Sequence, residues 1–203
     1  MSKGLLIVFS GPSGVGKDTV LKELLKKNDN LKLSISATTR KKRIGEIDGQ
    51  DYYFLKEHEF LDLASNDKML EYAKYCSNYY GTPREPIERW LNEGLDVILE
   101  IEVQGGLQIL EKRPDSVGIF ILPPSLQELE QRLRTRGTDL DEVILNRLKR
   151  AKLEIAETSR YDYAVINEKV DVCAENVNMI IRSEKMKYKN MKKVIEGVLL
   201  NGK

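Results

Sequence analysis

The sequence predicts an α/β protein built in three layers, with a central parallel sheet covered by helices on both faces. Short apolar runs rich in branched residues alternate with helix-spaced segments through both ends of the chain, as in parallel strands linked by helices. The first apolar run leads through a glycine-rich turn directly into a helix-spaced segment. A polar stretch without helical period over 38–51 interrupts this alternation, and it predicts a small lobe inserted over about 37–90.

The N-terminal part of the chain predicts a strand, a helix and a second strand. Leu5–Phe9 is a continuous apolar run of the kind found in buried parallel strands. Lys17–Lys27 carries valine and leucine at helical spacing, and the turn cluster Asn28–Asn30 ends this helix. Leu31–Ser36 alternates between apolar and polar residues, so we expect a second strand there.

The predicted lobe combines short strands with short helices. We expect strands at Tyr52–Leu55 and Met69–Tyr75, helices at Glu57–Ala64 and Pro86–Asn92, and a turn at Asn78–Pro83.

The second half of the chain resumes the alternation of strands and helices. Ser125 is expected to cap a helix, because Glu128 follows at the third position as in a capping box. The expected strands are Asp96–Val103, Val117–Leu122 and Tyr163–Asn167, and the expected helices are Gly105–Lys112, Leu126–Thr135, Val143–Thr158 and Ala174 to about Val198.

Composition indicates one globular domain over 1–203. Hydrophobic residues make up 41% and charged residues 32% of 203 residues, and the net charge of +1 gives no overall attraction to nucleic acid or to an anionic membrane. No apolar run approaches the roughly 20 residues that cross a bilayer. Cys76 and Cys173 have neither metal-ligand spacing nor a disulfide pattern, so we expect reduced thiols in a cytoplasmic protein. The oligomeric state stays open.

The glycine-rich turn carries the main functional signal. Gly11-Pro12-Ser13-Gly14-Val15-Gly16-Lys17 matches G-x-x-x-x-G-K between a strand and a helix, which is the context that such a phosphate-binding loop requires. Its glycines allow backbone N–H groups to point inward, the helix N-terminus adds its dipole, and Lys17 brings a positive charge to the β- and γ-phosphates. The sequence therefore predicts a nucleoside triphosphate site.

The loop departs from the usual motif at one position. A serine or threonine that ligates Mg²⁺ normally follows the lysine, whereas this chain has Asp18, with Thr19 next. Asp18 either ligates the metal through its carboxylate or lies in the first helical turn, where it favours the helix dipole and repels a nearby phosphate. The sequence leaves both possibilities open.

A phosphate-binding loop is shared by kinases, GTPases and ATPases, so the other motifs must separate them. A GTPase needs Asn-Lys-x-Asp to recognise guanine, and Asn167-Glu168-Lys169-Val170-Asp171 does not fit that motif. The distinguishing features lie between residues 34 and 104.

Several ordered segments in and after that region resemble the guanylate kinase family of P-loop nucleoside monophosphate kinases, which phosphorylate GMP. The resemblance runs from about Gly4 to at least Asn167. Its segments are Ser36-Ala37-Thr38-Thr39-Arg40, Arg43-Ile44-Gly45-Glu46, Gly49-Gln50-Asp51-Tyr52-Tyr53-Phe54, Glu71-Tyr72-Ala73, Asn78-Tyr79-Tyr80-Gly81-Thr82, Leu99-Glu100-Ile101-Glu102-Val103-Gln104-Gly105, Pro123-Pro124-Ser125 and Arg136-Gly137-Thr138.

The resemblance implies a P-loop kinase fold with a core over about 1–36 and 95–203, a GMP-binding lobe over about 37–90 and a helical lid over about 126–150. It further implies that Arg40, Arg43, Tyr52 and Tyr80 bind the GMP phosphate, with arginine offering paired donors and tyrosine a phenolic donor. Taken singly, the two arginines also fit a solvated basic run, and the tyrosines fit ordinary core or surface aromatics.

The resemblance assigns guanine recognition to Glu71, with Ser36 and Thr82 bonding other edge atoms. A carboxylate accepts both the N1–H and the N2 amino donors of guanine, whereas adenine presents an acceptor at N1 and lacks the amino group. Choosing adenine would leave carboxylate lone pairs unpaired, a mismatch of several kcal/mol that gives discrimination on the order of 10⁴. The alternative for Glu71 is a solvated strand carboxylate.

Glu100 and Glu102 share one face of a strand because they are two residues apart. They lie at the carboxyl end of that strand, where parallel sheets bind ligands. We expect Glu100, with Asp18, to act at the metal by orienting its water or an arginine, and Glu102 to help hold guanine.

Positive charge for the transferred phosphoryl group is expected from the lid. Arg132 and Arg136 are four residues apart on one helix face, and Arg147 follows in the next helix. The resemblance makes these three arginines catalytic together with Lys17 and Arg40, and it places Asn167 at adenine. The alternative is that the lid arginines are ordinary surface charges.

The sequence thus predicts a Mg²⁺-dependent kinase whose substrates are ATP and GMP and whose products are ADP and GDP. The transfer is expected to be direct and in line, because phosphoryl transfer depends on positioning and charge and needs no covalent enzyme intermediate. The alternatives are a non-catalytic interaction module of the same family, against which the intact Lys17 argues, a kinase for another acceptor, and an NTPase switch.

Overall fold

The computed structural model describes residues 3–75, 77–135 and 140–200. Its core is a sheet in which every pair of neighbouring strands is parallel, as predicted. The strand order is β2 (Leu31–Leu33), β7 (Asp96–Glu100), β1 (Leu6–Ser10), β8 (Val117–Leu122) and β9 (Tyr163–Ile166). Because all strands run the same way, their carboxyl ends share one edge of the sheet.

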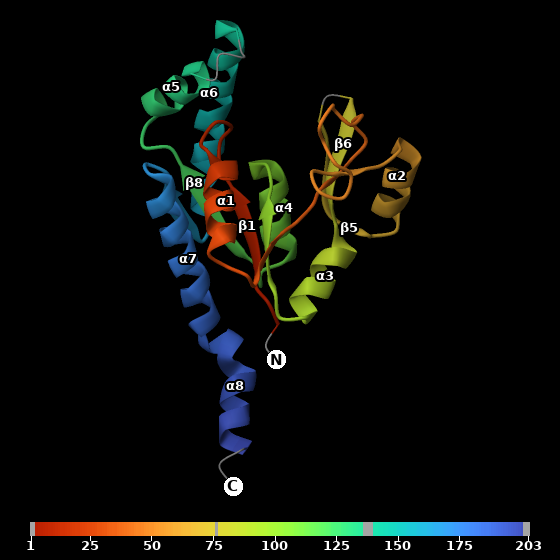
Figure 1. Cartoon of the computed structure of the whole chain (residues 1–203), viewed down its shortest axis with the longest axis vertical. Helices are drawn as coiled ribbons and strands as arrows, with labels where there is room; N and C mark the ends of the chain where they lie inside the picture. The colour runs from red at the N-terminus through yellow and green to blue at the C-terminus, as the bar shows by residue number, and fades with distance from the viewer. Residues whose placement is uncertain (1–2, 76, 136–139, 201–203) are drawn as a thin grey trace.

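Helices cover both faces of this sheet, which makes the three predicted layers (Figure 1). α1 (Lys17–Lys26) and α7 (Val170–Met186) pack on one face, and α3 (Arg84–Asn92) and α4 (Val103–Lys112) pack on the other. The fold class is therefore confirmed.

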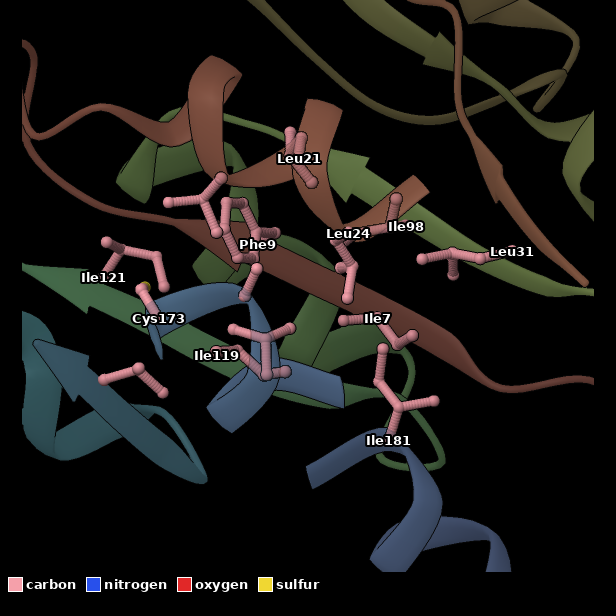
Figure 2. Close-up of a cluster of buried hydrophobic side chains, with 14 of the residues drawn as sticks. Ile7, Phe9, Leu21, Leu24, Leu31, Ile98, Ile119, Ile121, Cys173 and Ile181 are labelled. Carbon is pink, nitrogen blue, oxygen red and sulfur yellow. The ribbon is translucent and has the colours of Figure 1, made fainter. Parts of the chain in front are cut away.

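The central strand β1 explains why the core has two halves. Side chains alternate across a strand, so Ile7 and Phe9 enter the layer with α1 and α7, while Leu6 and Val8 enter the opposite layer. Figure 2 shows the first layer, where Phe9 and Ile119 of the sheet lie among side chains of the two helices. Burial on both faces matches the continuous apolar run that the sequence places there.

A second sheet lies to one side of the core with the helix α2 (Glu57–Ser65) (Figure 1). Its strand order is β4 (Tyr53–Phe54), β3 (Ala37–Thr38), β6 (Asn78–Pro83) and β5 (Met69–Tyr75). β3 and β4 are parallel, whereas β6 is antiparallel to both of its neighbours.

The predicted turn at Asn78–Pro83 is wrong, because this segment is the strand β6. It pairs on both sides, with β3 and with β5. Gly81 serves close packing here rather than turning: a Cβ at this position would lie 2.8 Å from the Glu71 carbonyl oxygen and 3.0 Å from the Phe60 ring. Tertiary pairing has overridden the local turn signal of Asn, Gly and Pro.

Other predicted boundaries also differ from the structure. The predicted strand Leu31–Ser36 ends at Leu33, and the chain then enters the second sheet at Ala37. The predicted strand Asp96–Val103 ends at Glu100, and Val103 begins α4. The predicted final helix is divided at Lys187, whose ψ of 139° is extended, into α7 and α8 (Tyr188–Leu200). Figure 1 shows α8 leading away from the sheet.

α5 (Leu126–Thr135) and α6 (Asp141–Ala156) pack against each other through Leu129, Leu133 and Ile144. The expected cap is present, because the Glu128 N–H donates to the Ser125 hydroxyl at 3.0 Å. α6 begins two residues before its predicted start, and a short 3₁₀ turn over Glu157–Arg160 replaces its predicted last residues. In the described residues, no helix is both long enough and apolar enough to cross a membrane.

Candidate active site

The loop Gly11–Lys17 connects the carboxyl end of β1 to the first turn of α1. Gly14 and Gly16 have φ angles of 88° and 95°, a left-handed conformation that costs little only for glycine. Gly16 is the N-cap of α1, so N–H groups of the first helical turn face the loop. The loop therefore has the backbone conformation of an anion cradle, with the helix dipole behind it.

Lys17 lies at the start of α1 and folds back over the loop. Its Nζ donates to the Gly11 carbonyl oxygen at 2.8 Å, which uses one of the three donors of an ammonium group. The lysine charge is thus held across the cradle, where an entering phosphate would meet it.

The two predicted metal residues lie together beside Lys17. The Glu100 carboxyl at the end of β7 is hydrogen-bonded to that of Asp18, in the first turn of α1. Burial, followed by Asp18, raises the pKa of Glu100 to about 7, and the Lys17 charge opposes this rise. Two adjacent carboxyls repel each other when both are charged, so a cation bound between them is favoured.

In the described residues, no group of three or more His, Cys, Asp or Glu side chains lies close enough to hold a metal ion. A pair of carboxylates nevertheless suits Mg²⁺, which usually keeps several waters and binds one or two carboxylates together with substrate phosphates. The donor set at Asp18 and Glu100 therefore fits a metal that arrives with a nucleotide.

α5 contacts the phosphate-binding loop through Arg132. The Arg132 guanidinium donates to the carbonyl oxygens of Val15, at 3.3 Å, and Asn167, at 3.0 Å, and it pairs with Glu128 at 3.0 Å. Gly14 lies under the same helix, since a Cβ there would be 2.6 Å from the Leu133 Cδ2 atom. The predicted lid arginine is therefore adjacent to the loop.

Asn167 follows β9 and contacts the phosphate-binding loop. Its Nδ2 donates to the Val15 carbonyl oxygen at 2.8 Å, and its Oδ1 is buried without a hydrogen-bond partner in the described part of the chain. A cleft of about 470 Å³ opens beside it, lined also by Gly16, Thr19 and Arg132. The structure thus brings together three residues predicted at ATP: Thr19, Asn167 and Arg132.

The structure shows less about the other lid arginines that the sequence predicts. Arg136 lies outside the described residues. Arg147 lies on α6 with a partly buried side chain. Arg134 points away from the loop into ion pairs with Glu130 and Asp141.

The second sheet gathers the predicted phosphate-clamping residues around Arg40. Its guanidinium lies 5.4 Å from the centroid of the Tyr52 ring and is hydrogen-bonded to Tyr80, whose ring meets Tyr52 at 6.2 Å. Burial is the main cause that raises the pKa of Tyr52. The Tyr52 phenol is therefore a neutral donor at neutral pH.

Glu46 organises this cluster, and sequence reasoning assigned it no role. Its carboxylate accepts hydrogen bonds from both terminal nitrogens of Arg40, at 2.7 and 3.0 Å, and from the Arg43 backbone N–H at 2.7 Å. The Arg40 contact is the main cause that lowers the pKa of Glu46 to about 2. The Arg43 side chain is exposed. Ser36 is partly buried, and its carbonyl oxygen accepts the Tyr53 N–H.

Glu71 and Thr82 face each other across β5 and β6, and both are buried. The Thr82 hydroxyl donates to Glu71 Oε1 at 2.6 Å. Burial is the main cause that raises the pKa of Glu71, while the Thr82 bond opposes it. A buried carboxyl held by one neutral donor is not the solvated strand residue that the alternative interpretation requires.

Glu102 contacts a different part of the structure from Glu71. It is the N-cap residue of α4 and is exposed, and its carboxylate accepts from Arg150 of α6 at 2.9 Å. Arg150 also pairs with Glu154 at 2.7 Å. The sequence gives no signal for this contact, because no local pattern marks an ion pair between residues 48 positions apart.

Glu100 connects the two halves of the site. Asp18 and Lys17 affect its pKa on one side, and Glu100 contributes to the raised pKa of Tyr52 on the other. One carboxyl at the end of β7 is therefore within electrostatic range of both the anion cradle and the Arg40 cluster. Such an arrangement can bind two anionic groups next to each other.

Comparisons with known proteins point to one family. The family model described as guanylate kinase matches residues 3–184. The chain is 56% identical to a guanylate kinase of Lactococcus lactis subsp. lactis over 90% of this chain and 89% of that protein. It is 49% identical to a guanylate kinase of Oceanobacillus iheyensis over 98% and 97% of the two chains. A crystal structure of guanylate kinase from Anaplasma phagocytophilum is similar with a TM-score of 0.77 at 37% identity, covering 96% and 95%.

Proposed function

The chain belongs to the guanylate kinase family, and from this membership we infer that it transfers the γ-phosphoryl group of ATP to GMP, giving ADP and GDP. The observation that carries this function is the combination of an anion cradle beside Lys17, an Arg40 cluster with two tyrosines, and the Glu71 carboxyl buried in the second sheet. The ATP phosphates require the anion cradle, and the GMP phosphate requires the Arg40 cluster. The guanine base requires a pair of hydrogen-bond acceptors.

The ATP phosphates are proposed to lie in the loop Gly11–Lys17, with Lys17 at the β- and γ-phosphates. Thr19 and Asn167 border the cleft beside the loop, which suits them to the nucleoside part of ATP. Arg132 is close enough to turn from its backbone acceptors toward the phosphates, while Arg136 and Arg147 stay predictions as further lid charges.

Asp18 and Glu100 are proposed to hold Mg²⁺ together with the ATP phosphates. Bound there, the metal would neutralise charge on the β- and γ-phosphate oxygens. Asp18 then takes the place of the usual serine or threonine. The proximity of the Glu100 carboxyl to Asp18 supports this role over a purely helix-dipole role for Asp18.

The acceptor is proposed to place its phosphate at Arg40, Arg43, Tyr52 and Tyr80, and its guanine edge at Glu71, Thr82 and Ser36. Glu102 is proposed to hold guanine from the other side once it parts from Arg150. The GMP phosphate oxygen then attacks the γ-phosphorus in line, and the protein contributes orientation and positive charge. Cytoplasmic location and the absence of nucleic-acid partners stay predictions from composition.

An acceptor comparison tests this function directly. Wild-type protein is mixed with ATP and Mg²⁺ and with GMP, dGMP, IMP or AMP, and ADP formation is measured. We expect GMP to be the best acceptor and AMP to be very poor, because adenine cannot satisfy Glu71. Equal use of AMP and GMP, or no transfer to GMP, would contradict the proposal, as would full activity after chelation of Mg²⁺.

Acidification is expected to raise the KM for GMP much more in the wild-type protein than in the Glu71→Gln variant, since the titration of Glu100 on the ATP side is common to both proteins. The pKa of Glu71 is raised by burial, so its carboxylate gains a proton as pH falls through that value, and its O–H then opposes the guanine donors. The measurement is KM for both substrates between about pH 7.5 and about pH 5. The Glu71→Gln variant is the control, because it keeps the titration of the GMP phosphate but loses that of residue 71.

A further inference from the structure

Gly105 of α4 lies against the buried carboxyl of Glu71. A Cβ at Gly105 would be 2.9 Å from Glu71 Oε2 and 2.8 Å from the Cδ1 atom of Ile101, whereas ordinary contacts of a Cβ begin near 3.4 Å. The core helix and the strand β5 of the second sheet therefore approach each other at a position where the helix has no side chain.

The Glu71 carboxyl has little room to move away from this contact. Thr82 holds its other oxygen, Oε1, at 2.6 Å, and the residue is only 6% exposed. The strand behind it is fixed by pairing with β6, where Glu71 faces Thr82. Any group added at position 105 would therefore turn the carboxyl out of the plane set by Thr82 and the strand.

We propose that Gly105 is a positioning residue for guanine recognition, because its missing side chain leaves the space in which Glu71 holds both oxygens toward the base. This inference rests on the proposed function of the site. Guanine presents two neighbouring donors, and a carboxylate meets both only in one orientation. Hypoxanthine, the base of IMP, lacks the N2 amino group and depends less on that orientation.

The backbone of α4 does not itself require glycine at this position. Gly105 is not among the glycines with positive φ in the described chain, and alanine favours a helix over glycine. Gly105→Ala therefore tests the contact with Glu71 rather than helix formation. Gly197→Ala in α8 is a matched control, because no atom lies within 4 Å of its added Cβ.

The experiment measures kcat and KM for GMP, IMP and ATP in both alanine variants, with unfolding midpoints as a check on folding. For Gly105→Ala we expect a KM for GMP raised by about tenfold or more, as when a hydrogen bond to a charged group is lost. We expect kcat to stay within about threefold, KM for ATP to stay unchanged, and the preference for GMP over IMP to shrink. Gly197→Ala is expected to match wild type.

A second variant distinguishes the effect of the contact with Glu71 from the effect of the contact with Ile101. It also keeps the proposal testable if Gly105→Ala alone folds poorly. Ile101→Val removes Cδ1, so the pair Ile101→Val with Gly105→Ala loses the closest apolar contact, at 2.8 Å, while it keeps the contacts with Ile101 Cγ1 at 3.0 Å and with Glu71 Oε2 at 2.9 Å. We expect the raised KM for GMP to persist. A return to the KM of Ile101→Val alone, a KM for ATP that rises in parallel, or an unchanged GMP-to-IMP preference would overturn the inference. If wild-type protein itself does not phosphorylate GMP, the proposed function fails instead.

Discussion

Lys17→Ala is expected to lower kcat by about 10³-fold while leaving the protein folded. The ammonium group is held over the loop by the Gly11 carbonyl oxygen, where charge develops on the transferred phosphoryl oxygens. Removing one preorganised donor of this kind costs about 3–4 kcal/mol of transition-state stabilisation. Alanine suits the first turn of α1 at least as well as lysine, so the unfolding midpoint is expected to change little.

The control for this variant is Lys22→Ala. Lys22 lies in the same helix and is exposed to solvent, so its removal changes the net charge equally without touching the loop. Initial rates at saturating ATP and GMP are measured for both variants. If the kcat of Lys17→Ala is close to that of Lys22→Ala, Lys17 does not contribute to the catalytic step.

Glu71→Gln is expected to lower kcat/KM for GMP by about 10³-fold with little change in the KM for ATP. The amide keeps the size of the carboxyl but presents an NH₂ group to a base edge that consists of donors. A buried donor facing a donor loses the hydrogen bond and leaves both groups unsatisfied, and such mismatches discriminate by about 10³-fold or more. Glu71 is buried, so water cannot repair the mismatch.

Glu93→Gln is the matched change for this test. Glu93 is the exposed C-cap residue of α3 and undergoes the same loss of charge outside the site. Both substrates are varied separately in each variant. If the variant loses kcat/KM equally for GMP and ATP, Glu71 stabilises the second sheet and does not recognise guanine.

The core sheet and the phosphate-binding loop were predictable because their signals are local. Leu5–Phe9 is apolar throughout since both faces of β1 are covered, and glycine alone tolerates the φ angles at residues 14 and 16. The strand β6 was missed because its pairing partners lie elsewhere in the chain. Asparagine, glycine and proline form turns in isolation, whereas here β3 and β5 hold the segment extended.

The site was predictable in its residue types but less so in its contacts. The shared carboxyl ends of parallel strands bring Glu100 toward the loop, which the sequence implied, yet its hydrogen bond to Asp18 depends on how α1 is seated. The Arg150–Glu102 pair depends on how α6 packs beside α4. Such long-range pairings have no periodic signature.

The pairing of Arg40 with Glu46 has a consequence for substrate capture. Arginine side chains lose considerable rotational freedom when they bind a ligand, which weakens affinity. Here that freedom is lost once, as the chain folds, because both terminal nitrogens are already fixed by Glu46 and the guanidinium lies beside two aromatic rings. At the proposed GMP site, an arriving phosphate would therefore meet an ordered guanidinium, and binding would not have to order that flexible side chain.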